Sequence, residues 1–478
     1  MSEFIVIQVG QCGNQIGSAM WPQILQEYNV PITPTTIQET PTIKNQSDYR
    51  FSSFFNVSKA KQDIQFNCLQ DLIDNKVKAR AICIDMEDSV VARFKTGKLK
   101  GLFDDKCLVT NYPGSGNNWA EVFKSLGFCE HGPQYQEVIL NCLRHSVERC
   151  DSLHGFLTMF STGGGTGSGL GTFVLNMLAD FYPKIERFST PVYSTGTEDV
   201  ITSPYNNLLA TQKLLEHATC VFPVENRCLL NIVNTKYRKT FMGKGGPHLT
   251  MFSATDDMNR IVVDMLLHLT SGSRFPGRLN FDMNEINTNM VPFPEMKFIS
   301  SGFNHITTSG GITAKSTSSR QKEEMFLAAC HRSNQLIQVD PLGPKSVLLS
   351  STLIGRGDYI ITDLQSHIEK IQAKAKFTPW SKKSMKLALC NVAPNGQKAA
   401  LFSLFNTTAL SGLFVHLKGH FDSLFRKKAH LHHYTKMNNF DMNYFYESIE
   451  AVETVLQKYD ELEKMKPLNV PRLKPQIR

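Results

Sequence analysis

Six glycines fall within nine consecutive positions of the stretch FSTGGGTGSGLGTF, residues 160–173. An apolar run, GFLTMFS, leads into it, and apolar residues at 3.6-residue spacing follow it as far as Pro183. This order predicts a buried strand, a turn and a helix. The unpaired N–H groups at such a helix start favour an anion, and glycine lets the backbone approach phosphate oxygens closely. The stretch therefore predicts a phosphate-binding loop.

This loop matches neither of the two common phosphate-loop patterns. Its glycines do not have the G-x-G-x-x-G spacing, and the nearest lysines are Lys124 and Lys184, so a Walker lysine is excluded. A nicotinamide-dependent dehydrogenase, which needs the first pattern, is the least favoured function. A turn that needs glycine only for packing is disfavoured by the position between a strand and a helix. We expect phosphate binding without lysine, with Thr166 and Ser168 as hydroxyl donors.

Strands and helices alternate along the first half of the chain. A strand at residues 4–9 runs directly into a helix from Gln11, and a second strand spans residues 79–87. We predict an α/β fold with a doubly wound parallel sheet over residues 1–230, covered by helices on both faces. The Thr- and Pro-rich segment at about 29–65 is predicted to be a surface insertion.

Two further parts follow this first domain. Residues 231–408 are predicted to hold a long core helix, at 256–271, and an α+β intermediate domain with short β-rich runs. Residues 409–478 show apolar residues at coiled-coil-like spacing, which predicts an antiparallel helical hairpin joined near Asn438 and Asn439 and followed by a short basic tail.

Composition narrows the class of protein. With 478 residues, 41% of them hydrophobic and 20% charged, the chain can bury several cores. No apolar stretch approaches the roughly 20 residues that a membrane span needs. The 11 cysteines include no C-x-x-C pair, which favours reduced thiols in the cytosol. A net charge of +8 without a long basic run gives no sign of nucleic-acid binding. We expect a cytoplasmic protein with neither membrane nor nucleic acid as a partner.

Other polar loops are expected at the same edge of the sheet. QCGNQIG begins at Gln11, PGSGNNWA spans residues 113–120, and Asp85 and Glu87 stand at alternate positions of the second strand. Two carboxylates on one strand face suit a hydrated magnesium ion. Acids at a strand end are more often solvated caps, so each loop alone is weak evidence. Several such loops at one edge are much stronger evidence.

Seven motifs in order along the chain resemble the tubulin family: QVGQCGNQIG, DME, GSGNNWA, GGGTGSGLGTF, SPYNNLLA, LNFDMNEINTNMVPFP and FRKKAHLHHYT. The resemblance covers nearly the whole chain and implies a GTP/GDP-binding domain, an intermediate domain and a carboxyl-terminal hairpin. It implies that Gln11, Asp85 and Glu87 hold Mg²⁺, that Asp199 lies near the ribose, and that Gln15, Asn226 and Asn259 hold the guanine. It also implies that the nucleotide contacts Cys12, Gly114, Ser115, Gly116, Asn117, Asn118, Ser161, Gly163, Gly164, Gly165, Thr166, Gly167, Ser168 and Gly169.

The acids of LNFDMNE are the candidate catalytic residues. Asp282 and Glu285 are three apart on a short predicted helix, so they share a face. The resemblance to α-tubulin implies that they reach the GTP of the next subunit and help activate the attacking water, whereas β-tubulin has lysine at the position of Glu285. Two acids early in a helix also favour its dipole, which is the alternative explanation.

Departures from α- and β-tubulin point to a divergent member. Ser203 replaces the glutamate before PYN, Thr255 stands where an aromatic residue stacks on guanine, and residues 465–478 carry no acid. EDVITSPYN, the AHLHHY run and the absent acidic tail most resemble the epsilon subfamily. This implies a role at centrioles and basal bodies, in doublet and triplet microtubules, with delta-tubulin, α/β-tubulin and centriolar proteins as partners. A nucleotide-binding adaptor that does not polymerise, or another divergent tubulin such as delta, remains an alternative.

The histidines of the predicted hairpin are candidate metal ligands. His416 and His420 stand at i, i+4, but no further ligand follows at a recognisable spacing. A basic surface with Arg426, Lys427 and Lys428 explains this region better.

Overall fold

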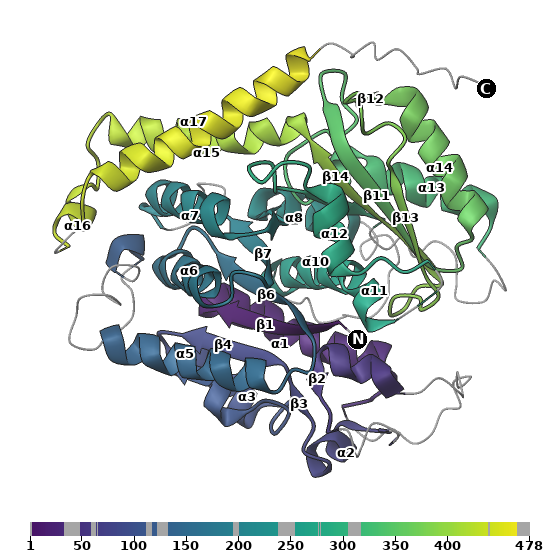
Figure 1. The fold of residues 1–478 in the computed structure, drawn as a ribbon, viewed down its shortest axis with the longest axis horizontal. Coiled ribbons are helices and arrows are strands. Elements are labelled where there is room, and N and C mark those ends of the chain that lie inside the picture. The colour runs from purple at the N-terminus through teal and green to yellow at the C-terminus, as the bar shows by residue number, and fades with distance from the viewer. Residues whose placement is uncertain are drawn as a thin grey trace, which may run out of the picture.

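Two β-sheets, joined by the long helix α10 (Ala254–Leu269), form the body of the protein (Figure 1). The computed structural model describes residues 2–32, 48–58, 64, 66–110, 117–121, 132–194, 200–237, 254–275, 277, 279–304, 317–437 and 440–465. The core helix predicted at 256–271 is confirmed, and it begins and ends two residues earlier than predicted.

The first sheet is parallel, as predicted. Within the described residues its strand order is β5-β4-β1-β6-β7-β8, and β9 also pairs with β7. Side chains of β1 alternate between two cores, because successive residues of a strand point to opposite faces: Phe4 and Val6 join one core, and Ile5, Ile7 and Val9 join the other. Its strands are β1 (Glu3–Val9), β4 (Ala81–Asp85), β5 (Leu108–Thr110), β6 (Leu153–Ser161), β7 (Glu186–Tyr193), β8 (Cys220–Val221) and β9 (Val224–Glu225).

Helices cover both faces of this sheet, as the alternating pattern predicts. Residues of α1, α3, α8 and α10 share a core with Phe4 and Val6, and residues of α5, α6 and α7 share the opposite core. The sheet is therefore doubly wound. The bounds are α1 (Gly10–Glu27), α3 (Asp88–Thr96), α5 (Gly132–Glu148), α6 (Gly171–Phe181), α7 (Ser203–His217) and α8 (Asn226–Ile232).

Part of the predicted surface insertion lies in the core instead. Phe51, Phe54 and Phe55 are at most 5% exposed: Phe55 packs against Trp21, Phe51 against Tyr28, and Phe54 against Phe4 of β1. The segment contains a 3₁₀ turn (Asp48–Ser53) and β2 (Phe55–Asn56), which pairs with β3 (Lys78–Ala79). The short helix α2 (Leu69–Asp74) lies between β2 and β3 in the chain. The prediction for about 29–65 is wrong at 51–55, because three phenylalanines there bury apolar area that a surface loop would expose. Residues 33–47 lie outside the described residues.

The second sheet is mixed and belongs to the predicted α+β domain. Its order is β10-β14-β11-β12 within the described residues, with β13 also paired to β11. Helices α13 and α14 pack on one face of it, and α12 packs against β11 (Figure 1). The bounds are β10 (Ser300–Phe303), β11 (Val347–Gly357), β12 (Lys376–Phe377), β13 (Lys386–Cys390), β14 (Ala399–Thr407), α11 (Ser271–Arg274), α12 (Met283–Met290), α13 (Ser319–Cys330) and α14 (Ile361–Lys374).

The chain ends in the predicted antiparallel hairpin. Helices α15 (Ser411–Phe425) and α17 (Asn443–Lys464) lie across α7, and the short helix α16 (His432–Thr435) stands at their tip (Figure 1). Tyr205 of α7 packs against Phe421, Tyr434 and Phe445, with ring centroids 5.4–5.5 Å apart. The predicted junction at Asn438 and Asn439 lies outside the described residues, as do the tail residues 466–478.

A buried ion triad joins the two sheets through α10 and α11. Glu27, at the end of α1, contacts Nη1 of Arg274 at 2.5 Å and Nη2 of Arg356, on β11, at 3.0 Å. All three side chains are fully buried. Both guanidinium groups also donate to the carbonyl oxygen of Leu267, at 2.7 and 3.2 Å. The triad therefore fixes α1, α10 and β11 relative to one another.

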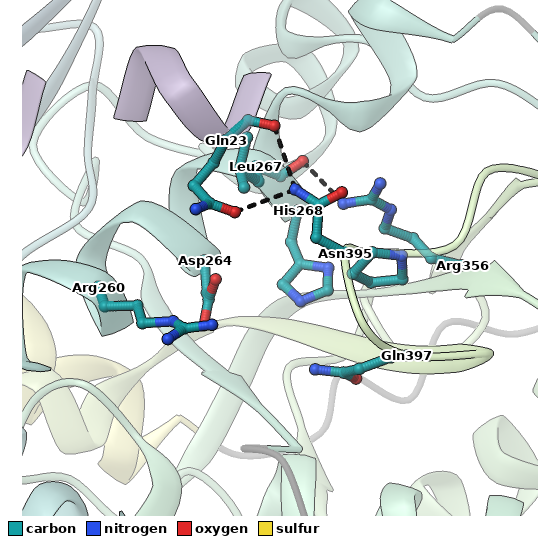
Figure 2. A pocket seen from close by; sticks show the side chains of 9 residues that line it. Gln23, Arg260, Asp264, Leu267, His268, Arg356, Asn395 and Gln397 are labelled. Carbon is teal, nitrogen blue, oxygen red and sulfur yellow. Dashed lines mark hydrogen bonds between the residues drawn. The ribbon is translucent and has the colours of Figure 1, made fainter. Parts of the chain in front are cut away.

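A pocket lies beside this triad, between α1, α10 and the loop after β13. Figure 2 shows Asp264 and Arg260 side by side, and the Asn395 amide donating to Gln23 at 3.0 Å. Burial raises the pKa of the Asp264 carboxyl to about 7; the charge of Glu27 adds to this, and Arg260 and Arg356 oppose it. Between about pH 4 and pH 7, the folded chain therefore keeps a proton on Asp264 that the unfolded chain, with an aspartate pKa of about 3.9, releases.

This proton makes the stability of the fold depend on pH. The contribution of protonated Asp264 is fully present below about pH 4 and is lost as the pH rises through about 7. We expect Asp264→Asn to be more stable than the wild type at pH 8 by about 1–3 kcal/mol, with a gap that narrows toward pH 5. Melting temperatures of both proteins across this range measure the gap. Asp256→Asn, an exposed position in the first turn of α10, is the control. A gap that is constant, or widens toward acid, would contradict the assignment.

Candidate functional site

The glycine loop lies between β6 and α6, as the sequence predicts. It passes through a π-helical turn at Thr166–Leu170 before α6 begins. Such wide turns are frequent at functional sites. Among the described residues, a Cβ added at Gly164 would meet Ser161 Oγ at 3.8 Å and Asn117 Oδ1 at 3.9 Å and nothing closer. The loop is therefore open toward Ser161 and Asn117, which leaves room for a group that approaches its backbone.

The turn after β1 supports the glycine loop from behind. Gly10 has a φ of +71°, and a Cβ there would lie 3.2 Å from the backbone nitrogen of Gly167. Position 10 therefore requires glycine for two reasons: its backbone conformation, and its close contact with Gly167. Buried Asn14 donates to the carbonyl oxygens of Gly10 and Ile84, both at 3.0 Å, and so ties this turn to the end of β4. The candidate residues beside Asn14 keep partial access: Gln11 is exposed, and Cys12 and Gln15 are partly buried.

Cys12 has the properties of a packing residue. Burial raises the pKa of its thiol to about 12. The thiolate, which is the reactive form, is therefore scarce at neutral pH. We therefore expect Cys12 to pack at this site without reacting.

The two carboxylates of DME do not share a strand. β4 ends at Asp85, and Glu87 is the N-cap residue of α3. The prediction of alternate positions on one strand is wrong, because the chain turns at Met86. Asp85 is 3% exposed and accepts hydrogen bonds from the N–H groups of Met86 (2.8 Å) and Glu87 (3.4 Å). Burial raises its pKa to about 6, against the effect of these two donors.

Asn206 joins the two phosphate-loop candidates to the hairpin, and sequence reasoning missed it. Its amide donates to the carbonyl oxygens of Asn117 and Gly163, both at 2.9 Å. Its oxygen accepts from the Trp119 N–H at 3.0 Å and from the Tyr434 hydroxyl at 2.7 Å. The side chain is fully buried and uses all of these groups. Asn206 is the asparagine of the SPYN motif, and its membership of that motif was the sequence feature that could have indicated its role.

Loss of the Asn206 side chain should free the loop at Asn117 and the glycine loop at Gly163. We expect Asn206→Ala to lower the free energy of unfolding by about 2–3 kcal/mol, because it leaves buried partners without hydrogen bonds. Denaturant titration measures this loss, and equilibrium binding should show nucleotide affinity weakened about tenfold or more. Asn207→Ala is the control: Asn207 donates to Ser194 Oγ at 2.8 Å, so about 1 kcal/mol is expected. Equal effects of the two variants would show that Asn206 has no special role.

The remaining candidates lie on several different elements. Asn118 is buried and donates to the carbonyl oxygen of His433 at 2.9 Å. Asn226 is the first residue of α8, and Asn259 is partly buried on α10. Ser203 is 2% exposed and hydrogen-bonded to Ser194. Gly114, Ser115, Gly116 and Asp199 lie outside the described residues.

Asp282 and Glu285 lie at the opposite end of the sheet. The Ser2 hydroxyl, just before β1, donates to Asp282 Oδ2 at 3.0 Å, whereas the glycine loop adjoins Gly10, just after β1. A strand rises about 3.3 Å per residue, so roughly 25 Å separates the acids from the loop of the same chain. The two acids also differ in role. Asp282 is the N-cap of α12 and accepts from the Glu285 N–H at 3.0 Å, so it precedes the helix and does not share a helical face with exposed Glu285.

The comparisons with known proteins decide the family. Residues 3–234 match the model of the "Tubulin/FtsZ family, GTPase domain", and residues 294–418 match the "Tubulin C-terminal domain". The tubulin epsilon chains of mouse and human are each 38% identical to this chain over 98% and 99% of both lengths, respectively. Human tubulin beta-1 is 28% identical over 98% of this chain and 95% of its own. The chain belongs to the tubulin family.

As a tubulin, the chain is a GTP-binding subunit with a cytoskeletal, cytoplasmic role. The predicted fold class and the resemblance to epsilon-tubulin are confirmed. The GTPase-domain match also removes the dehydrogenase alternative. No described helix is long and apolar enough to cross a membrane. Among the described residues, no three His, Cys, Asp or Glu side chains gather as a metal site.

Proposed function

We propose that this tubulin is a structural subunit whose head-to-tail assembly completes a GTPase site between successive subunits. One observation carries the proposal: the candidate catalytic acids and the glycine loop stand at opposite ends of β1. Glu285 therefore cannot serve the nucleotide of its own chain. A contact between unlike ends of identical or related subunits repeats along a filament, which is how tubulin-family subunits would assemble.

Asp282 and Glu285 have different roles in the proposed GTPase site. Asp282 orients the start of α12 through its bonds with the Glu285 N–H and the Ser2 hydroxyl. Glu285 is exposed, and its carboxylate makes no hydrogen bond with a described residue. It can therefore reach a neighbouring subunit and orient, or accept a proton from, the attacking water. Asp282 is then a positioning residue, and Glu285 carries the catalytic role.

The residues present fit a nucleotide with Mg²⁺. The open space before Gly164 fits a phosphate, with backbone donors from Gly163–Gly169 and the side chains of Ser161 and Thr166 around it. The Ser168 hydroxyl, predicted as a donor to phosphate, is buried and donates instead to the carbonyl oxygens of Gly164 and Gly165 within the loop. Gln15, Asn226 and Asn259 would hold the guanine, and Gly114, Ser115, Gly116, Asn117 and Asn118 the distal phosphates. Gln11, Glu87 and Asp85 would hold Mg²⁺, which neutralises phosphate charge; a cation would also favour the ionised form of Asp85, which burial disfavours.

The similarity to epsilon chains supports a role at centrioles and basal bodies. There the subunit would form or stabilise doublet and triplet microtubules, alongside delta-tubulin, α/β-tubulin and centriolar proteins. Depleting the protein and imaging centriole cross-sections by electron tomography tests this role. We expect centrioles with single microtubules. Intact triplets after complete depletion would contradict the proposal.

An adaptor that holds nucleotide without polymerising is the second candidate. The Ser203 hydroxyl is hydrogen-bonded to Ser194 beside Gly163. Thr255 has no aromatic ring that could stack on guanine. Both weaken the case for an actively exchanged nucleotide. Co-sedimentation with assembling α/β-tubulin separates the two: incorporation in proportion to polymer supports the subunit, and absence from the polymer supports the adaptor.

A further inference from the structure

The tip of the carboxyl-terminal hairpin carries a compact basic surface, here called the hairpin-tip patch. All six of its side chains are exposed, and none forms an ion pair with a described residue. The sequence holds no acid between Asp422 and Asp441 to neutralise them. The patch consists of the cations Arg426, Lys427, Lys428 and Lys436, with His432 and His433 between them. Desolvation and the neighbouring charges of His433 and Lys436 lower the pKa of His432, so this ring is uncharged at neutral pH.

The backbone of the patch is held in a defined shape. Lys428 and His430 have φ values of 52° and 59°, which non-glycine residues adopt only when the surroundings require it. The Tyr205 hydroxyl donates to the Ala429 carbonyl oxygen, between them, at 2.6 Å. The Lys428 and Ala429 N–H groups donate back to Phe425 and Leu424. The patch is therefore a preformed surface, and a partner need not order it on binding.

The patch is also hydrogen-bonded to the nucleotide loops. Asn118 donates to the His433 carbonyl oxygen at 2.9 Å, and Tyr434, the next residue, donates to Asn206. Asn206 in turn donates to Asn117 and Gly163. A movement of either loop with the state of the bound phosphates would therefore reach the backbone that carries His432 and His433.

The surroundings of the patch favour a short acidic polypeptide over a larger polyanion. Helix α17 follows directly and contains six acidic residues and two lysines. Glu447, Glu450 and Glu453 are exposed on it, so a nucleic-acid duplex or an anionic bilayer extending beyond the patch would meet like charge. Tyr446 is 56% exposed and packs against Phe425, next to Arg426, which gives a partner's apolar side chain a place beside its carboxylates.

We propose that the hairpin-tip patch docks a short acidic segment of a partner polypeptide, and that the nucleotide loops control its affinity through Asn118, Asn206 and Tyr434. The proposal uses the GTP binding of the family and does not depend on hydrolysis or on assembly. It therefore stands or falls separately from the proposed GTPase site.

A fluorescein-labelled oligo-glutamate peptide tests the docking. We expect the full chain to bind it, as read by fluorescence anisotropy. The triple variant Arg426→Glu, Lys427→Glu, Lys428→Glu should weaken binding about tenfold or more, since each reversal removes one attraction and adds one repulsion. The control reverses three exposed lysines of the intermediate domain, Lys374→Glu, Lys382→Glu and Lys383→Glu, with the same change in net charge. Equal losses in both variants would show that only net charge matters and would overturn the proposal.

Two further measurements complete the test. An oligothymidylate or phosphatidylserine vesicles that bind as tightly as the peptide would overturn the choice of an acidic polypeptide. Peptide affinity should differ severalfold between chains loaded with GTP and with GDP, and Tyr434→Phe should reduce this difference because it removes the bond to Asn206. Equal affinities of the two wild-type forms would overturn the nucleotide control.

Discussion

Glu285→Ala should suppress GTP hydrolysis in the assembled polymer by roughly a hundredfold to ten-thousandfold, the usual contribution of a positioned general base. Nucleotide binding should stay unchanged, because Glu285 lies roughly 25 Å from the glycine loop of its own chain at about 3.3 Å of strand per residue. Assembly with partner tubulins followed by chromatography of released nucleotide measures turnover. Binding to the unassembled chain is measured separately.

Glu285→Gln is the matched control for this prediction. Glutamine keeps the length and one oxygen of the side chain but cannot accept a proton from water. If Glu285 accepts the proton, the glutamine variant should be as slow as the alanine variant; if Glu285 only orients water, part of the rate should remain. A fall in nucleotide binding as large as the fall in turnover would show instead that the residue is structural.

Glu27→Ala should lower the free energy of unfolding by about 3–5 kcal/mol. The variant leaves Arg274 and Arg356 buried without a carboxylate, and removing one partner of a buried ion pair exposes the full cost of the other's desolvation. The nucleotide domain and the intermediate domain should also separate more readily, because the triad joins α1 to β11. Denaturant titration gives the loss of stability, and limited proteolysis reports the loosening between the domains.

A surface ion pair provides the comparison. Glu323 is partly exposed and paired with Lys370 between α13 and α14, and such pairs contribute about 0–1 kcal/mol. We therefore expect Glu323→Ala to have a small effect. A loss from Glu27→Ala no larger than this would contradict the role given to the triad.

Much of the fold could be predicted because its signals are local. The continuous buried run of β1, the glycines between β6 and α6, and the 3.6-residue spacing in α6 and α10 each follow from a short stretch of chain. The same holds for the loops at the carboxyl ends of the strands, whose convergence follows from a parallel sheet.

The features that the sequence did not reveal depend on distant partners. Asn206 bonds to Tyr434, 228 positions away, and Glu27 bonds to Arg356, 329 positions away. Phe51, Phe54 and Phe55 are buried, but the Thr- and Pro-rich segment before them predicts a surface loop. The separation of Asp85 from Glu87 depends on where one strand ends, and strand ends are the least predictable part of a sequence pattern.

The nucleotide content of the purified chain tests the account most directly. The protein is denatured, the released nucleotide is identified by chromatography, and the analysis is repeated after assembly with partner tubulins. We predict guanine nucleotide at about one per chain, from the single glycine-loop site, with GTP converted to GDP only after assembly. Purified chain that carries no guanine nucleotide, or GTP that stays unchanged in the polymer, would contradict a GTPase site completed between subunits.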